Sequence, residues 1–420
     1  MKNETLSLLG TTALVQTPFV KISIGKYTFG YYNKSSASGV DARGAYTLNK
    51  ITYPNYIQDL KVKKVNGVVN QYTLKMVYAI TENNDPNFFE KVFSSVSKTR
   101  KIIFSYGDLS TPSFCYKDEE AIITDVKNNF SMSSSTITYT ISAVSTGKLS
   151  GVGSYAFPGK LAKPSDEIKR ILYDSRYGLL EVFYGMRDRN LVEFEGLIAS
   201  NDKVVNIASK TNISVLDYLT YLVSCMTSDV NQSTIKKSIY SFVVVDEISD
   251  KFRGPYFKVV ELKKSLPDAY STAYSLDIGY PSQNVVTQFN IENDESYSLY
   301  YNYSKELSDS NYVQRINDAG EIEEVFAPTI ASGNAFRVTT EADKSWWTRV
   351  TQYPIKASVT FKGLLRPAIL MTHVKLNVLF YGRKHISSGI YVVTEQTDSI
   401  GFDGFKTTLK LLRIDKEELE

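Results

Sequence analysis

The sequence predicts a β-rich α+β protein in which two small antiparallel β-barrel domains flank an inserted α/β domain. Three observations support this fold class. Alternating apolar residues dominate both ends of the chain, helical patterns fall in its middle, and a run rich in Gly and Pro follows the first β-rich part. We therefore expect a first β-barrel domain with one helix at 1–150, an α/β domain at 151–275, and a second β-barrel domain at 276–420 with an insertion at about 304–345.

The clearest local pattern in the first domain is a long hairpin. Residues 56–65 and 71–80 both alternate, and between them lies Asn66-Gly67, the pair that best tolerates positive φ in a tight turn. Leu60 and Val62 share one face of the first strand, so we expect that face to be buried. Further strands of this domain are expected at 21–29, 101–106, 121–126 and 136–144.

Three segments have helical patterns. Asp85 can cap a helix, and apolar residues then recur on one face over 88–96, which predicts a helix over an open end of the first barrel. Ser214 is followed by Asp217 three residues later, which is close to a capping box and opens a second helix. A shorter helix is expected at 165–172.

The rest of the chain is expected to be mainly strands and one insertion. Residues 304–345 are polar and poorly periodic, so we expect an insertion or a long loop there, after which Trp346-Trp347 reopens the ordered part. The remaining strands are expected at 179–184 paired with 191–198, and at 241–247, 256–262, 285–291, 297–303 and 373–381, with about four strands between 355 and 414.

Composition and charge exclude several classes of protein. The net charge is +3, from 48 basic and 45 acidic residues, so a nucleic acid bound through its phosphates is not indicated. No apolar run approaches the roughly 18 residues that a spanning helix needs, which argues against stable membrane insertion. Residues 1–10 lack a convincing signal-peptide pattern and the two cysteines form no disulfide framework, so we expect folding in a reducing cytoplasm.

The sequence offers little material for a catalytic, metal or cofactor site. His373 and His385 are the two histidines, and neither has a Cys, Asp or second His at ligand spacing. Cys115 and Cys225 lie far apart and have no histidine neighbour, so a thiolate nucleophile is unsupported. Residues 145–150 lack the upstream Gly of a phosphate loop, and a hairpin turn explains them better. We therefore expect no catalytic, metal-binding or cofactor-binding residues.

Two alternatives to a purely structural protein stay open. Glu193 and Glu195 alternate on one predicted strand and so face the same side, as the two carboxylates of a wall-degrading virion enzyme can, although a solvated strand face is the simpler interpretation. Tyr31-Tyr32 and Tyr300-Tyr301-Asn302-Tyr303 supply rings for a glycan- or receptor-binding virion module, although alternating tyrosines usually pack across a sheet.

The most specific motif lies in residues 389–413. The run Gly404-Phe405-Lys406-Thr407-Thr408-Leu409-Lys410-Leu411 resembles the closing hairpin of phage baseplate hub proteins, the late-control or tail-hub family. That family ends its second barrel on a Gly-Phe-x-Thr-x-Leu-x-Leu-x-Arg-like strand, one residue out of step with this sequence. It often carries a histidine in the first strand of the hairpin, where this sequence has Gln396-Thr397. Gly401 and Gly404 allow a tight reversal between the two strands.

The resemblance implies a structural baseplate hub of a phage or phage-derived tail, without enzymatic activity or a cofactor. Such hubs form homotrimers, in which two barrels from each chain make a ring that adapts the sixfold tail tube to the threefold central spike. The implied partners are the tail tube protein, the central spike protein and other baseplate subunits, and DNA only passes through the lumen. The chain ends six residues after Ile414, so we expect the spike to be a separate protein. The implied location is the virion tail baseplate, assembled in the host cytoplasm.

Overall fold

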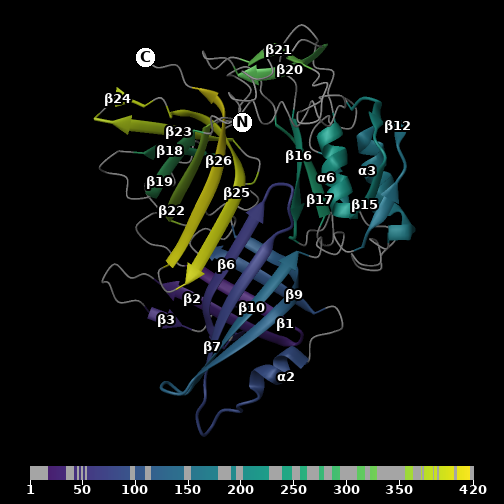
Figure 1. The fold of residues 1–420 in the computed structure, drawn as a ribbon. Coiled ribbons are helices and arrows are strands. Elements are labelled where there is room, and N and C mark those ends of the chain that lie inside the picture. Colours follow the sequence, from purple (N-terminus) through teal and green to yellow (C-terminus); the bar gives the residue numbers. More distant parts are fainter. Residues whose placement is uncertain are drawn as a thin grey trace.

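The computed structural model is dominated by one fifteen-stranded β-sheet. This sheet connects a first module (18–145) to a C-terminal module (274–416), and an inserted module (153–262), which has two helices among its described residues, lies beside them (Figure 1). The structure describes residues 18–34, 42–44, 47–48, 51–52, 54–94, 100–108, 115–145, 153–177, 191–194, 202–226, 239–247, 256–262, 274–278, 286–293, 310–316, 322–328, 355–362, 370, 373–381, 383–385, 387–401 and 404–416.

The first module consists of antiparallel strands, and its predicted hairpin is confirmed. β6 (Ile57–Val65) pairs with β7 (Gln71–Ala79), and Leu60 and Val62 are buried as their alternation predicts. The other strands of the module are β1 (Pro18–Ile24), β2 (Tyr27–Lys34), β3 (Ala42–Gly44), β4 (Thr47–Leu48), β5 (Ile51–Thr52), β8 (Lys101–Asp108), β9 (Tyr116–Ser131) and β10 (Thr136–Ser145).

The described ladders of the first module form an open sheet. Their order is β6-β7-β10-β9-β8-β1-β2-β3, so β2 and β6 lie near opposite ends. These ends approach through a backbone hydrogen bond of 3.1 Å from the Gly30 N–H to the Pro54 carbonyl, whereas β6 pairs along its length with β25 (Gly389–Gly401). The β-rich fold class is confirmed. The edge of β6 that would have to pair with β2 to close the first barrel pairs with β25 instead.

One end of the first module is covered by α2 (Phe88–Ser94), the helix that the sequence predicts (Figure 1). Asp85 precedes it, and its carboxylate accepts a hydrogen bond of 2.9 Å from the Asn87 N–H. Phe89 is buried, with its ring 4.9 Å from that of Tyr139 and 5.6 Å from that of Phe29. The short helix is therefore held mainly by its apolar face.

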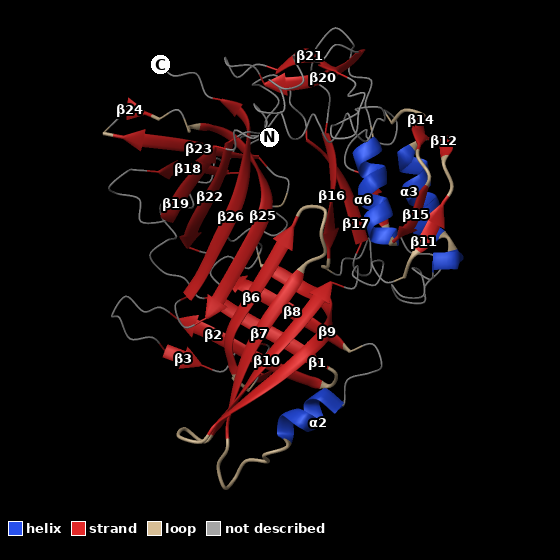
Figure 2. Cartoon of the chain, in the orientation of Figure 1, coloured by secondary structure: helices blue, strands red, loops and turns tan. Residues whose placement is uncertain are grey.

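The inserted module packs α3 (Pro164–Tyr173) and α6 (Val215–Cys225) together among small sheets (Figure 2). Both helices are predicted by the sequence, and Ser214 caps α6 by accepting a hydrogen bond of 3.1 Å from the Asp217 N–H. The strands and turn are β11 (Tyr155–Phe157), β12 (Lys160–Ala162), η4 (Ser175–Tyr177), β13 (Val192–Phe194), β14 (Val205–Ile207), β15 (Lys210–Ile213), β16 (Ile239–Val245) and β17 (Tyr256–Leu262).

The C-terminal module contains the predicted closing hairpin. β25 pairs with β26 (Gly404–Lys416) as far as the opposed Gly401 and Gly404. Val374, Leu376 and Val378 alternate on the buried face of their strand, whereas Phe380 continues the alternation but is 51% exposed, because the ladders of that strand with the main sheet end at Val378. The other strands are β18 (Tyr274–Ile278), β19 (Val286–Asn293), β22 (Ile355–Lys362), β23 (His373–Phe380) and β24 (Arg383–Lys384).

The predicted insertion at 304–345 contains a hairpin rather than only a long loop. β20 (Ser310–Ile316) pairs with β21 (Ile322–Pro328) in a two-stranded sheet of its own. β13 pairs in parallel with β17, whereas its predicted partner at 179–184 lies outside the described residues. The predicted strand at 297–303 and Trp346-Trp347 lie outside them as well.

The modules share their hydrophobic cores. Val243 and Val260 of the β16–β17 pair pack into the core of the C-terminal module, while Phe242 of the same pair packs into that of the inserted module. Ile400 and Phe405 of the closing hairpin pack into the core of the first module. The domain boundaries expected from the sequence stay a prediction.

We predict that Phe89→Ala lowers the stability of the first module by about 3 to 5 kcal/mol, because it removes a fully buried ring and leaves a cavity. Phe130→Ala is the matched control, since Phe130 is 50% exposed on β9 and its loss should change stability by less than about 0.5 kcal/mol. Denaturant unfolding followed by tyrosine fluorescence measures both. Equal effects of the two substitutions would contradict the role assigned to α2.

Candidate functional site: a buried polar junction

The tip of the β6–β7 hairpin lies where the three modules meet. The Asn66 N–H donates to the Thr394 carbonyl of β25 at 2.9 Å, and the Gly67 N–H donates to the Phe242 carbonyl of β16 at 2.8 Å. Gly67 has a φ of +72°, which explains why the Asn-Gly pair suits this position. The sequence predicts a tight turn here, whereas the observed loop spans 66–70 because its backbone bonds to two other modules.

Lys64 places a buried ammonium group at this junction. It follows Leu60 and Val62 in the alternation of β6, so its side chain lies on the buried face of the strand. Its Nζ donates a hydrogen bond to Glu119 Oε1 of β9 and lies 3.7 Å from the centre of the Tyr116 ring. Lys64 and Glu119 are 6% and 2% exposed, so this ion pair is screened from water.

Asp246, which directly follows β16, brings the inserted module into the same cluster. Its Oδ2 accepts from Asn70 Nδ2 and from the Tyr72 hydroxyl, both at 2.8 Å, and its Oδ1 accepts from the Ser145 hydroxyl. The Tyr72 oxygen also lies 3.1 Å from Glu119 Oε2. A carboxylate from the inserted module is thus held entirely by side chains of the first module.

The closing hairpin completes the junction from the C-terminal module. Gln396 stands opposite Lys64 in the β25–β6 ladder, and its Nε2 donates to the Tyr116 hydroxyl at 2.7 Å and to Asp398 Oδ2 at 2.6 Å. The Thr407 hydroxyl donates to Asp398 Oδ1 at 2.6 Å. Gln396, Asp398 and Thr407 are buried. The Gln396 amide nitrogen and both Asp398 oxygens have partners within the junction, whereas Gln396 Oε1 has no hydrogen-bond partner among the described residues.

Burial shifts the ionisation of the junction toward neutral carboxyl groups. It raises the pKa of Asp246 to about 7, with a further increase from the nearby Glu119, whereas the bonds from Ser145, Asn70 and Tyr72 act in the opposite direction. Burial likewise raises the pKa of Asp398 to about 7, opposed by its bond from Thr407 and by the charge of Lys64. The pKa of the Tyr72 hydroxyl is raised well above its ordinary value, again mainly by burial, so this group keeps its proton.

The arrangement is suited to holding modules together. The junction side chains are nearly all inaccessible to water, so a substrate has no access to them. Among the described residues, no group of three or more His, Cys, Asp and Glu side chains has a geometry that could hold a metal ion. The network therefore positions the inserted and C-terminal modules against the first one.

The described residues among those considered for chemistry from the sequence lie on separate elements. Glu193 lies half-buried on β13, and Glu195 lies outside the described residues. His373 is half-buried on β23, where burial lowers its pKa, and His385 is exposed with Nδ1 2.7 Å from the Ser387 hydroxyl. Cys225 is buried in the core of the inserted module.

The tyrosines considered for a binding module lie largely outside the part of the chain that the structure describes. Tyr31-Tyr32 lies on β2, and nothing is described of these two side chains. Tyr300-Tyr301-Asn302-Tyr303 lies outside the described residues, as do 146–150 of the loop compared with a phosphate loop. These hypotheses stay predictions.

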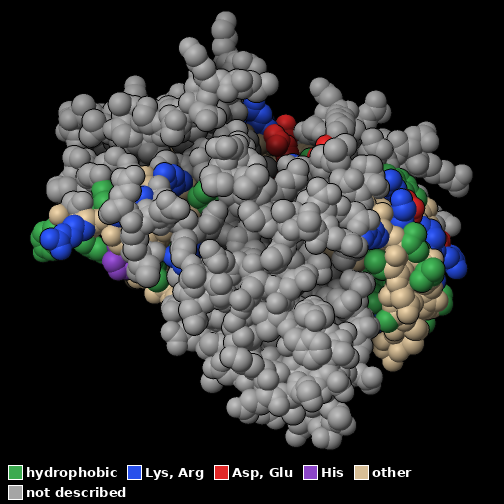
Figure 3. Space-filling view, turned by 90° about the horizontal axis from the view of Figure 1, so that it is seen from above, with side chains coloured by type: hydrophobic (Ala, Val, Ile, Leu, Met, Phe, Trp, Pro, Cys, Tyr) green, Lys and Arg blue, Asp and Glu red, His purple; other side chains and the backbone are tan. Residues whose placement is uncertain are grey.

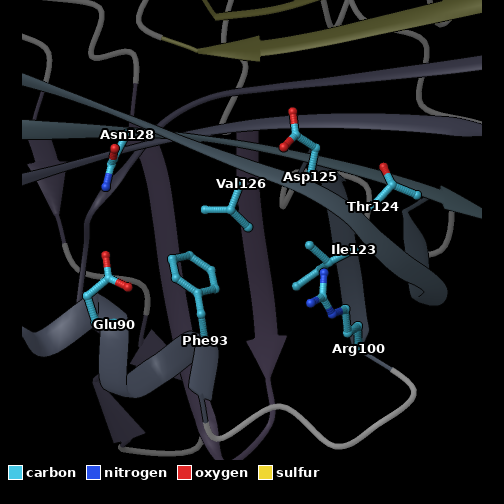
Figure 4. Close-up of a pocket in the computed structure, with 8 residues that line it drawn as sticks. All are labelled: Glu90, Phe93, Arg100, Ile123, Thr124, Asp125, Val126 and Asn128. Atoms are coloured by element: carbon cyan, nitrogen blue, oxygen red, sulfur yellow. The ribbon is translucent and has the colours of Figure 1, made fainter.

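An open groove of about 390 Å³ lies between α2 and β9 (Figure 4). Figure 4 shows Val126 and Asn128 of β9 pointing toward α2, whereas Asp125 points away from it. Glu90 of α2 therefore faces the groove without a second carboxyl directed at it from β9. This arrangement does not provide the two opposed carboxylates that glycoside hydrolysis requires.

No protein-family model matches the sequence. No curated protein matches it either. Solved structures do: a tail protein from Neisseria meningitidis MC58 is 10% identical, with a TM-score of 0.51 over 94% of this chain and 96% of that chain. The 43 kDa tail protein of prophage MuSo2 from Shewanella oneidensis is 11% identical, with a TM-score of 0.50 over 95% of this chain and 100% of that chain.

The chain has the fold of these tail proteins. The likeness extends over nearly the full length of each protein, so it includes the arrangement of all three modules rather than one of them. The predicted resemblance to phage tail proteins is confirmed at the level of the fold, although sequence identity is too low for a residue-by-residue transfer.

Within the tail-protein fold of this chain, we predict that Lys64→Met destabilises the protein by about 3 to 5 kcal/mol, because it leaves the buried Glu119 carboxylate without its cation. The matched control is Lys63→Met on the same strand. The Lys63 side chain is 41% exposed and its Nζ lies 3.4 Å from Glu395 Oε1, so its loss should cost no more than about 1 kcal/mol. Thermal unfolding of the two variants and the wild type compares them, and similar melting temperatures for both variants would contradict the assigned role.

Proposed function

We propose that this chain is a structural baseplate hub of a phage or phage-derived tail. The observation that carries the proposal is the whole-length likeness in fold to two tail proteins. The resemblance of residues 404–411 to the closing strand of hub proteins adds to it, because these residues form β26 and contribute Thr407 to the junction. The proposed role is architectural, without a chemical step.

The proposed assembly is a trimer whose ring contains two β modules from each chain. Such a ring offers six β modules to a sixfold tail tube and threefold symmetry to a central spike. The ladder between β6 and β25 supports this idea, because it joins the two β modules edge to edge within one chain and so fixes the spacing between them. A fixed spacing is what a ring of alternating modules requires.

The proposed partners are the tail tube protein, the central spike protein and other baseplate subunits, and DNA passes through the lumen without stable binding. In the part of the surface that Figure 3 colours, basic and acidic side chains are mixed with hydrophobic ones, without a large field of one charge. This surface suits protein contacts better than a grip on phosphates. Among the described helices, none is both long and apolar enough to cross a membrane. The proposed location is the virion tail baseplate, assembled in the host cytoplasm.

We predict that the purified chain forms trimers, alone or after addition of its spike protein. Light scattering coupled to size exclusion should then give three times the 47.3 kDa of one chain. Electron-microscope projections along the symmetry axis should show six similar densities around a central opening. A chain that stays monomeric at every concentration and in the presence of spike and tube proteins would contradict the hub.

A Glu193→Gln variant tests the proposed absence of catalysis, because Glu193 is one of the two carboxylates that the alternative wall-degrading enzyme would use. Wild type and Glu193→Gln should both release no fragments from peptidoglycan above the buffer level, because in this proposal Glu193 is a residue of β13 without a catalytic role. Release by the wild type that is lost in Glu193→Gln would favour the wall-degrading enzyme instead.

A further inference from the structure

The buried Tyr72 hydroxyl lies between two carboxyl groups from different modules. Its oxygen is 2.8 Å from Asp246 Oδ2 of the inserted module and 3.1 Å from Glu119 Oε2 of the first module. All three side chains are at most 2% exposed, so water does not supply missing hydrogen bonds. Their hydrogen bonds must therefore be satisfied within the junction.

One tyrosine hydrogen does not suffice for two ionised carboxylates. If the Tyr72 hydroxyl donates to Asp246, Glu119 Oε2 faces a tyrosine lone pair at hydrogen-bond distance, and the reverse holds if it donates to Glu119. One extra proton resolves the conflict: protonated Asp246 donates to the Tyr72 oxygen, and Tyr72 donates to Glu119. Asn70 and Ser145 still donate to the Asp246 oxygens in that arrangement.

The charges around this chain of hydrogen bonds also favour a bound proton. Lys64 of β6 is the cation that pairs with Glu119, and Asp398 of β25 is a third buried carboxyl close enough to interact with both. Glu247, beside Asp246, interacts with Glu119, Lys64, Lys117 and Asp118. The other polar groups that face the junction carry no charge: Asn70, Tyr106, Tyr116, Ser145, Gln396 and Thr407. Three buried carboxyls thus share one buried ammonium group.

We propose that docking of the inserted module onto the first module captures one proton in the Asp246–Tyr72–Glu119 chain, so that the junction loosens as the pH rises. The device is a pH-sensitive lock between modules. It is independent of the proposed function, because it depends only on contacts within one chain.

The sign of the effect follows from the raised pKa of Asp246. In the open junction this carboxyl has its ordinary pKa near 3.8, and in the closed junction burial raises it to about 7. Proton uptake therefore favours closure fully below the ordinary value, and the advantage is lost as the pH rises through about 7. Between these limits, one captured proton makes the opening equilibrium constant about tenfold larger for each pH unit.

Hydrogen exchange of the full chain measures this opening. The Gly67 and Glu120 amides are the reporters, because they donate across the module boundary to the Phe242 and Asp246 carbonyls at 2.8 and 3.1 Å. Protection factors, corrected for intrinsic exchange, are compared between about pH 5 and about pH 8 for the wild type and Asp246→Asn. We expect opening in the wild type to rise with pH more steeply than in Asp246→Asn, by about tenfold per pH unit below about pH 7.

Two further variants separate proton capture from simple loss of contacts. Asp202→Asn removes another buried carboxyl with a raised pKa, within the inserted module, and should leave the junction slope unchanged. Ser145→Ala removes a hydrogen bond to Asp246 and should lower protection at every pH while keeping the wild-type slope. Equal slopes in the wild type and Asp246→Asn, or a slope flattened by Ser145→Ala, would overturn the proposal.

A measurement on the wild type covers the case in which Asp246→Asn does not fold. Infrared spectra of protein with ¹³C-labelled aspartate should show the band of a protonated carboxylic acid at about pH 6, and this band should disappear as the pH rises past about 7. Part of the band should remain in Asp398→Asn, which removes the other junction aspartate whose pKa is raised to about 7. A wild type that shows only carboxylate bands at about pH 6 would overturn the proposal. A band that persists in folded Asp246→Asn with unchanged intensity would do so as well.

Discussion

The arrangement of the three modules depends on a buried ammonium group. Lys64 is enclosed among Glu119, Tyr116 and the closing hairpin, and a buried charge of this kind is tolerable only where its partners are present in the right geometry. The apolar cores give each module its stability, but apolar contacts are non-directional and permit many relative placements. The polar contacts select one of them.

The junction also explains why the inserted module interrupts the chain without disturbing the sheet. β16 and β17 turn one face to the core of the C-terminal module and the other to the helices of the inserted module, so this pair acts as a shared wall. Asp246 accepts a hydrogen bond from Asn70, and the Phe242 carbonyl of β16 accepts one from the Gly67 N–H, so both bind the tip of the β6–β7 hairpin. The three modules therefore meet at one point, and the contacts at that point fix their relative placement.

Local features of this fold could be predicted from the sequence, and the junction could not. The Asn66-Gly67 hairpin, the cap at Ser214 and the closing hairpin are set by residues close together in the chain. The pairing of Lys64 with Glu119 joins residues 55 apart, and that of Asp246 with Tyr72 joins residues 174 apart. One local signal was available, since Lys64 continues the buried alternation of Leu60 and Val62, and a charged residue on such a face predicts a buried partner. The alternation of apolar residues does not reveal where neighbouring strands stop. It therefore predicts neither the exposure of Phe380 nor the open sheet of the first module.

The polar seam between β6 and β25 bears on strand register as well as on stability. Buried ion pairs are often replaceable by hydrophobic residues without loss of stability, so stability alone does not explain Lys64, Gln396 and Asp398. A slip of one residue along this ladder would turn Gln396 and Asp398 to the opposite face and leave Lys64 facing different side chains. The same slip would turn the buried Ile400 out of the core. A slip of two residues would keep apolar residues on the buried face, but the hydrogen-bonded cluster would lose several bonds at once. The polar cluster therefore fixes the register in which the two β modules join, and with it the distance between them.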